Sequence, residues 1–351
     1  MNDSVDLKYM KRCLDLAAKA EGMTYPNPMV GSVIVHSGRI IGEGYHIKSG
    51  GPHAEVVAIN SVKEKELLKY STLYVNLEPC SHFGKTPPCA DLIVSCGIPR
   101  VVIGTKDTTE KVAGRGEAKL RDAGCDVVTG VAEEECRRLN RRFFTYHEKK
   151  RPYITLKWAQ SADGFLDIVR SSGDSPGINW ITGKAERTLV HKWRAFEQAI
   201  LIGAGTLRTD RPLLNVRDWK GNNPLKLILS SSGALDHLYI ENETNGTTVV
   251  FTHNMEVQYS SAVKVLLGRD SSSASQVLSY LYKTGIQSLF IEGGAMVLDS
   301  FINEGLWDEA RIFTGRQVFK EGVRAPELHK SKYSGTLFRG STLDIYVRDN
   351  S

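Results

Sequence analysis

The feature that most constrains this 351-residue chain is a set of four chemically matched side chains within 37 positions. They are His53 and Glu55, in the sequence Pro-His-Ala-Glu, followed by Cys80 and Cys89. One imidazole and two thiols can hold a zinc ion with a fourth position left open, whereas a structural zinc site normally uses four protein ligands. The chain must therefore fold so that these distant positions converge.

The local sequence predicts how they converge. Residues 54–68 are expected to form an amphipathic helix with His53 at its first turn. Residues 72–77 read as a strand that runs into Cys80. Residues 89–96 open a second helix, whose N-terminal dipole favours a thiolate.

His-x-Glu followed by Pro-Cys is typical of zinc deaminases, in which an activated water attacks an amine-bearing ring carbon. In that chemistry Glu55 is no ligand and instead moves protons to the departing ammonia. The alternative is that His53 and the cysteines are ordinary, partly buried residues. Eight residues separate Cys80 from Cys89, and this cationic loop, which contains Lys85, is expected to contact the substrate or to be a solvated turn.

Composition limits the class of protein. The net charge of +5 suits phosphate-bearing small molecules but is too diffuse for nucleic acid. No membrane span or secretory signal is found, so a cytoplasmic location is expected. All six cysteines lie within the first 136 residues, and those outside the metal set are expected to be small core residues rather than disulfides.

The order of predicted elements indicates two α/β domains, at 1–147 and 151–351, with a linker near 147–152. Strands are predicted at 29–35, 39–44, 72–77, 100–105 and 126–129 in the first. In the second they are predicted at 153–157, 199–203, 225–230, 247–252, 263–267, 287–291, 310–314 and 343–347. Further helices are predicted at 5–21, 115–123, 133–146, 184–196, 274–284 and 295–304.

Two glycine-containing strand ends, at 202–206 and 291–295, are suited to a backbone that approaches a pyrophosphate, although each is also compatible with a plain tight turn. The six-residue glycine spacing of a Rossmann domain is absent. Close to the first of them in the sequence lie Arg194, Arg208 and Arg217. Guanidinium groups are good ligands for a phosphate, although such a patch is usually just surface.

Short motifs in both halves point to one family. They are Pro26-Asn27-Pro28-Met29-Val30-Gly31, Gly42-Glu43-Gly44-Tyr45-His46, Val112-Ala113-Gly114-Arg115-Gly116, Trp180-Ile181-Thr182 and Glu292-Gly293-Gly294. With the long gap that ends in Thr-Pro-Pro-Cys, the chain resembles the bifunctional deaminase–reductases of riboflavin biosynthesis over nearly its whole length. The resemblance implies a cytidine-deaminase-like α/β/α sandwich followed by a dihydrofolate-reductase-like α/β domain.

The resemblance also implies ligands and roles. The first domain would bind Zn²⁺ through His53, Cys80 and Cys89, with Glu55 catalytic, and deaminate a diaminopyrimidinone ribosylamine 5′-phosphate. The second would reduce the ribosyl chain with NADPH. The implied substrate contacts are Asn27, His46, Lys85 and Asp107 in the first domain and Arg194, Leu214, Arg217 and Glu292 in the second. The implied cofactor contacts are Lys157, Thr182, Asp210 and Gly294.

Some positions depart from the family pattern, among them Ala162, Phe165, Asn215 and the loop 171–179. They leave open a working deaminase whose second domain is only structural. A nucleic-acid base deaminase with a binding module is a further alternative, and a zinc-stabilised scaffold fails to explain Glu55. The expected partners are small pyrimidine ribonucleotides, without nucleic acid or membrane, and a homo-oligomer, either dimer or tetramer, is expected.

Overall fold

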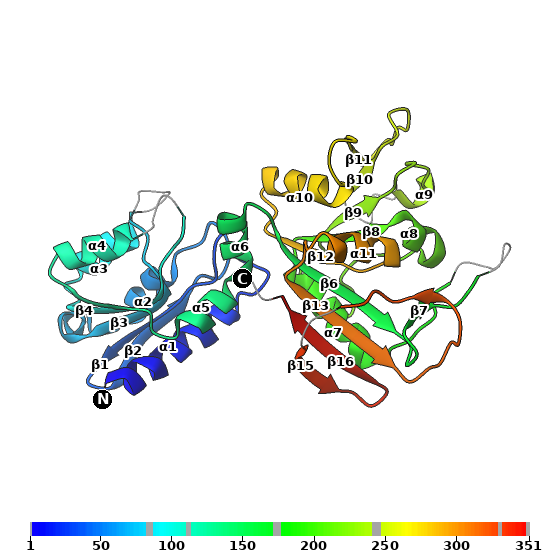
Figure 1. Cartoon of the computed structure of the whole chain (residues 1–351). Coiled ribbons are helices and arrows are strands. Elements are labelled where there is room, and N and C mark those ends of the chain that lie inside the picture. Colours follow the sequence, from blue (N-terminus) through cyan, green and yellow to red (C-terminus); the bar gives the residue numbers. More distant parts are fainter. Residues whose placement is uncertain are drawn as a thin grey trace. The chain divides into compact units, whose positions relative to one another are not determined.

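The structure is a computed structural model that describes residues 2–81, 87–109, 114–170, 177–240, 247–328 and 332–348. The chain divides into two compact units, Met1–Lys150 and Arg151–Ser351. Each unit is built from helices packed on a mixed β-sheet (Figure 1). None of the helices in the described ranges is both long and apolar enough to cross a bilayer.

The first unit is built on a five-stranded sheet of order β2-β1-β3-β4-β5. The hairpin β1–β2 is antiparallel and β1 pairs antiparallel with β3, whereas β3, β4 and β5 run parallel. The strands are β1 (Gly31–His36), β2 (Arg39–Tyr45), β3 (Thr72–Leu77), β4 (Arg100–Thr105) and β5 (Asp126–Thr129). The helices are α1 (Asn2–Ala18), α2 (Ala54–Ser61), the 3-10 helix η1 (Lys65–Tyr70), α3 (Cys89–Ser95), α4 (Arg115–Asp122), α5 (Glu133–Leu139) and α6 (Arg141–Lys149).

The central strands of this sheet are apolar on both faces, which requires a helical layer on each side. Leu73 and Val101 belong to a core cluster with residues of α2, α3 and α4. Their strand neighbours Tyr74 and Val102 point to the other face and pack with α1 and α5. The result is an α/β/α sandwich (Figure 1).

Three sequence predictions for this unit need correction. The helix predicted at 54–68 ends at Ser61, because Val62 turns into extended backbone and is buried in the core; η1 follows separately. The helix predicted at 133–146 is broken at Asn140, whose side chain hydrogen-bonds both backbone groups of Met29. Residues 147–149, predicted as linker, are the last turn of α6.

The second unit is built on a nine-stranded sheet of order β11-β10-β9-β8-β12-β6-β13-β16-β15. The seven strands from β11 to β13 run parallel, and β16 pairs antiparallel with both β13 and β15. The parallel strands are β6 (Tyr153–Gln160), β8 (Ala199–Gly203), β9 (Leu225–Leu229), β10 (Thr248–Thr252), β11 (Val263–Leu266), β12 (Ser288–Ile291) and β13 (Glu309–Gly315). The others are β15 (Lys332–Leu337) and β16 (Ser341–Val347), with β7 (Phe165–Asp167) and β14 (Val323–Arg324) forming a separate ribbon.

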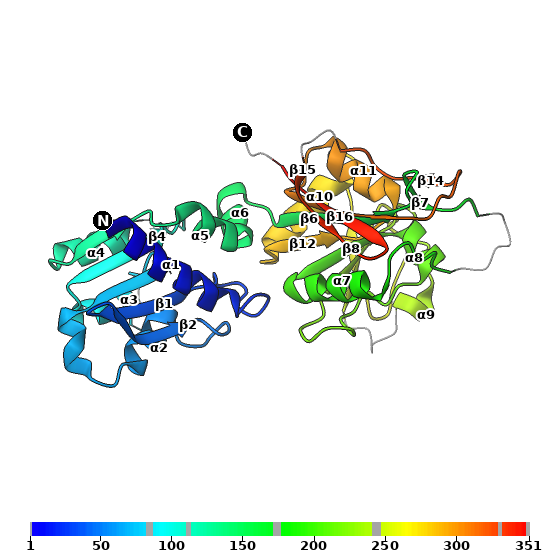
Figure 2. The same ribbon diagram turned by 90° about the horizontal axis from the view of Figure 1, so that it is seen from below.

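This sheet is also covered on both faces (Figure 2). Leu201 and Ile291 pack with α10 (Ser273–Lys283) and α11 (Ala295–Asn303). Ile200 and Phe290 point the other way and pack with α7 (Lys184–Phe196), α8 (Ala204–Asp210) and α9 (His237–Ile240). The continuous apolar runs in these strands are what a doubly covered parallel sheet requires.

Several short elements of this unit were not predicted from the sequence. Helix α8 has seven residues, one of them Gly205, so its helical propensity is weak. The ribbon strands β7 and β14 have three and two residues. Strand β15 contains lysine, serine and glycine and lies at the sheet edge, where apolar alternation is not needed.

Core packing predicts a large difference between two residues of α11. Phe301 is fully buried, whereas Met296 is 85% exposed. Phe301→Ala should lower the free energy of unfolding of this unit by about 3–5 kcal/mol, because it removes a ring and leaves a cavity. Met296→Ala should change it by less than about 0.5 kcal/mol. All five tryptophans lie in the second unit, so urea unfolding followed by tryptophan fluorescence measures it selectively. Equal effects of the two changes would contradict this packing.

Candidate active sites

The three predicted metal ligands converge in the first unit. His53 precedes α2, Cys80 follows β3, and Cys89 is the first residue of α3. Their ligand atoms all lie within 4.8 Å of one another. His53 Nδ1 is 3.2 Å from Cys89 Sγ and 3.6 Å from Cys80 Sγ. The backbone N–H of Cys89 donates to Cys80 Sγ at 3.3 Å.

The chemistry of these donors fits zinc. The thiol of Cys89 and the imidazole of His53 both lower the pKa of Cys80 well below that of an ordinary thiol, which favours the thiolate form that binds a metal. A thiolate, a second cysteine sulfur and an imidazole nitrogen are the ligand types that zinc prefers. Within the described part of the chain the cluster contains three protein ligands, which matches a catalytic rather than a structural zinc site.

Glu55 lies in the first turn of α2, two residues beyond His53, and is 3% exposed. It is not one of the clustered ligands. Burial raises the pKa of Glu55 to about 7. A hydrogen bond from its own backbone N–H and the charge of His53 act in the opposite direction. A carboxyl group with a pKa near neutrality can both accept and release a proton at working pH.

One of the predicted substrate contacts, His46, lies beside the metal ligand His53 and contacts a second, Asn27. His46 is 2% exposed, and its ring lies edge-on to that of His53 with centroids 5.7 Å apart. Its Nδ1 meets the carbonyl of Pro52 at 3.0 Å and must therefore carry the proton. Its Nε2 is then left to accept from Asn27 Nδ2 at 3.1 Å. Burial lowers the pKa of His46, which favours this neutral form.

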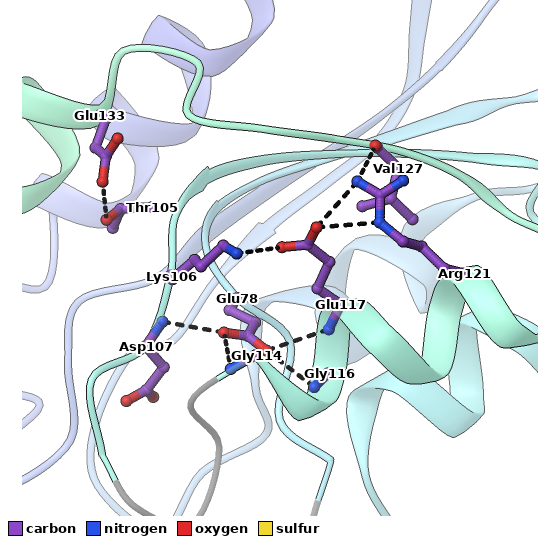
Figure 3. A network of polar contacts seen from close by, with 10 residues as sticks. All are labelled: Glu78, Thr105, Lys106, Asp107, Gly114, Gly116, Glu117, Arg121, Val127 and Glu133. Carbon is purple, nitrogen blue, oxygen red and sulfur yellow. Dashed lines mark hydrogen bonds and ion pairs between the residues drawn. The ribbon is translucent and has the colours of Figure 1, made fainter.

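The predicted contact Asp107 lies just after β4, next to a polar network (Figure 3). Its backbone N–H donates to Glu78 Oε2 at 3.2 Å, and its Oδ1 accepts from the N–H of Thr109 at 2.7 Å. Figure 3 shows its carboxylate directed away from Glu78. The fourth predicted contact, Lys85, lies outside the described residues.

The second unit contains two adjoining cavities, of about 850 Å³ and 260 Å³. The four predicted cofactor contacts, Lys157, Thr182, Asp210 and Gly294, all line the larger one. The four predicted substrate contacts, Arg194, Leu214, Arg217 and Glu292, all line the smaller one. Both cavities share the residues Lys157, Thr182, Asp210 and Glu292, so ligands in the two would meet there.

The larger cavity fits a dinucleotide at its glycine-containing wall. Gly203 ends β8, and Gly293 and Gly294 link β12 to α11. Gly294 has a φ of 67°, and a Cβ there would lie 3.0 Å from Thr206 Oγ1. This backbone, followed by the N-terminus of α11, suits the close approach of a pyrophosphate.

A buried ion-pair cluster lies where the two cavities adjoin, because Lys157 and Glu292 line both of them. Arg194 donates from Nε and Nη2 to the two carboxylate oxygens of Glu292, at 2.5 and 2.8 Å. Lys157 Nζ lies 3.7 Å from the same carboxylate. Burial alone would raise the pKa of Glu292, but the two cations lower it below its ordinary value. Burial has the opposite effect on the cation and lowers the pKa of Lys157.

The predicted substrate contacts of this unit differ in their freedom to bind a ligand. Arg194 also donates from Nη1 to the carbonyl of Asn215 at 3.2 Å, so its guanidinium group is largely occupied. Arg217 is exposed and donates to Asn215 Oδ1 at 3.2 Å. Leu214 is only 1% exposed. Arg217 is therefore the better placed of the two arginines to receive a phosphate.

Sequence reasoning did not assign some residues that line these cavities. Thr206 lines both cavities. In the sequence it was marked only as the last residue of the glycine-containing strand end at 202–206. His191 lines the smaller cavity, with Nδ1 accepting from the N–H of Arg217 at 3.3 Å. It lies one helical turn before Arg194 on α7, a spacing that places both on one face.

Together, the fold and the two sites define a two-domain enzyme, a zinc-type deaminase followed by a reductase. The family model of the cytidine and deoxycytidylate deaminase zinc-binding region matches residues 3–105. The RibD C-terminal domain matches residues 152–318. The chain belongs to the RibD family, the bifunctional deaminase–reductases of riboflavin biosynthesis.

Curated relatives support this along most of the chain. The riboflavin biosynthesis protein RibD of Aquifex aeolicus is 41% identical over 330 residues, which cover 92% of this chain and 90% of that protein. The RibD protein of Escherichia coli is 34% identical over 337 residues, covering 91% and 90%.

A solved structure is similar along nearly the whole chain. The diaminohydroxyphosphoribosylaminopyrimidine deaminase/5-amino-6-(5-phosphoribosylamino)uracil reductase of Thermotoga maritima matches with a TM-score of 0.89 at 38% identity, covering 99% of both chains. The predicted family and the predicted fold class, a cytidine-deaminase-like domain followed by a dihydrofolate-reductase-like domain, are confirmed.

The electrostatics of the larger cavity predict a pH-dependent stability. Burial and the neighbouring Asp167 raise the pKa of Asp210 to about 6. Because the pKa in the folded state lies above the ordinary value of 3.8, stability is lost as the pH rises through that interval. Allowing for partial exposure, Asp210→Asn should remove about 1 kcal/mol of this penalty and melt about 2–4 °C higher at pH 7.5.

Tryptophan fluorescence during heating measures this difference. It should narrow as the pH falls from 7.5 towards 4.5, where the wild-type carboxyl group becomes neutral. A difference that is the same at both pH values would contradict the raised pKa of Asp210.

Proposed function

We propose that the first domain removes an amino group by hydrolysis from 2,5-diamino-6-(5-phosphoribosylamino)pyrimidin-4(3H)-one. Water is consumed, ammonia is released, and 5-amino-6-(5-phosphoribosylamino)uracil is formed. The second domain then reduces the ribosyl to the ribityl side chain with NADPH. The observation that carries the proposal is the cluster of His53, Cys80 and Cys89 within 4.8 Å, with the buried Glu55 beside it. The proposed domains are 1–147 and 151–351.

In the deaminase site the metal and the protein have separate tasks. Zinc bound by His53, Cys80 and Cys89 would act as a Lewis acid that lowers the pKa of water. Glu55 takes the water proton on its carboxylate and returns it to the departing amine. Its burial supports this role, because a carboxyl group excluded from solvent is tuned towards neutrality. Asn27, His46, Lys85 and Asp107 are proposed to hold the nucleotide.

In the reductase site the residues position the two reactants. NADPH carries the hydride, so the protein supplies binding and orientation. Lys157, Thr182, Asp210 and Gly294 are proposed to hold the cofactor in the larger cavity. Arg194, Leu214, Arg217 and Glu292 are proposed to hold the ribose phosphate in the smaller one. The cavities' shared wall, which includes Lys157 and Glu292, supports direct contact between cofactor and substrate.

One assay tests both halves. The purified chain is given the diaminopyrimidinone nucleotide and NADPH, and ammonia release and NADPH oxidation are followed together, with zinc measured on the same protein. We expect ammonia release followed by one NADPH oxidised per ammonia. Ammonia release without NADPH oxidation would support the deaminase activity alone and would indicate that the second domain is a structural element.

A homo-oligomer and a cytoplasmic location stay predictions.

Glu55→Gln tests the proton-transfer role. Zinc should remain at about one per chain, because no ligand is removed, while deamination should fall by about 10²–10⁴-fold. Cys80→Ala is the matched contrast, since it removes a ligand and should lose the zinc itself. Metal analysis and ammonia release measure both variants, and reduction of the pre-deaminated nucleotide shows that the second domain is intact. Zinc loss in Glu55→Gln would instead make Glu55 a ligand.

A further inference from the structure

Glu78 is a buried carboxylate that neither site uses directly. It follows β3, lies two residues before Cys80, and is 4% exposed. Its Oε2 accepts from the backbone N–H groups of Asp107 and Gly114, at 3.2 and 3.0 Å. Its Oε1 accepts from those of Gly116 and Glu117, at 2.9 and 3.1 Å. Figure 3 shows the four amides converging on this one side chain.

The four amides take the place of a cation. Among the residues that the structure describes, no lysine, arginine or histidine forms an ion pair with Glu78. A buried carboxylate is costly unless it is hydrogen-bonded, and four N–H donors occupy its lone pairs. Two of these donors belong to the first turn of α4, where the helix dipole favours negative charge.

These contacts join two segments of the chain. Asp107 follows β4, whereas Gly114 and Gly116 lie at the start of α4, so one carboxylate binds the described residues on either side of the segment between β4 and α4. Gly114 has a φ of 81°, and a Cβ at Gly116 would lie 2.0 Å from the carbonyl oxygen of Pro79. The Gly-Arg-Gly motif is therefore required for the α4 start to pack directly against the segment that leads to Cys80.

We infer that Glu78 is a positioning residue of the deaminase. By binding Asp107 and the start of α4 to the segment that leads to Cys80, it sets the position of the Asp107 carboxylate relative to Cys80. The inference rests on the proposed function, in which Asp107 holds the nucleotide that reacts at the zinc site. Glu78 acts through the backbone of Asp107, because both of its carboxylate oxygens already accept from backbone N–H groups.

Glu78→Gln tests this in the full chain. Glutamine retains one acceptor oxygen, and its NH₂ group would face two of the backbone N–H donors. Zinc should stay at about one per chain and reductase activity should be unchanged. The KM for deamination should rise by about 10–100-fold, with a smaller change in kcat. Residues that orient a site through hydrogen bonds typically have effects of this size.

Glu117→Gln is the matched control. Its side chain pairs with Lys106 and Arg121, at 3.3 and 2.9 Å, and only its backbone N–H contacts Glu78. The same carboxylate-to-amide change at the start of α4 should leave the deamination KM within about twofold, because ion pairs with such exposed cations contribute little.

A double-mutant cycle with Asp107→Asn locates the effect. If Glu78 acts through Asp107, adding Glu78→Gln to Asp107→Asn should raise KM no further, whereas independent roles would give multiplicative increases and overturn the inference. Zinc loss in Glu78→Gln would also overturn it. Should that variant fail to fold, an unchanged KM in Asp107→Asn alone would overturn it. A wild-type chain that releases no ammonia would instead refute the proposed function.

Discussion

Parallel strand pairing is the constraint on which both sites depend. Parallel strands end at the same edge of a sheet, so the residues that follow them meet there. In the first domain β3 and β4 pair in parallel, which brings the segments after them, with Cys80 and Asp107, to one edge. In the second domain β8 and β12 do the same for Thr206 and Glu292.

The two domains stabilise the negative charge of these two buried carboxylates, Glu292 and Glu78, in different ways. Glu292 is neutralised by two cations, Arg194 and Lys157, in a cluster that lines the cavities. Among the residues that the structure describes, the carboxylate of Glu78 is instead stabilised by four backbone N–H groups. Side-chain cations can be rearranged when a charged ligand arrives, whereas backbone amides at a helix start are fixed by the fold. The Glu292 cluster of the reductase is therefore suited to rearrange when a ligand binds, whereas the contacts of Glu78 in the deaminase are suited to remain in place.

The sequence was sufficient for short-range features and insufficient for contacts across the chain. The metal residues were predictable because zinc chemistry restricts residue type and spacing. The break at Asn140 was not, because it depends on hydrogen bonds to Met29, 111 residues away. Likewise the four donors to Glu78 lie 29 to 39 residues beyond it. Local propensity carries no information about such partners.

The contacts of Glu78 also decide where the substrate's phosphate cannot bind. A helix start next to an active site is ordinarily an attractive anion site. In α4 the first-turn amides of Gly116 and Glu117 already donate to a carboxylate, which would also repel a second anion. The phosphate of a nucleotide in the deaminase site must therefore be recognised by groups other than these first-turn amides.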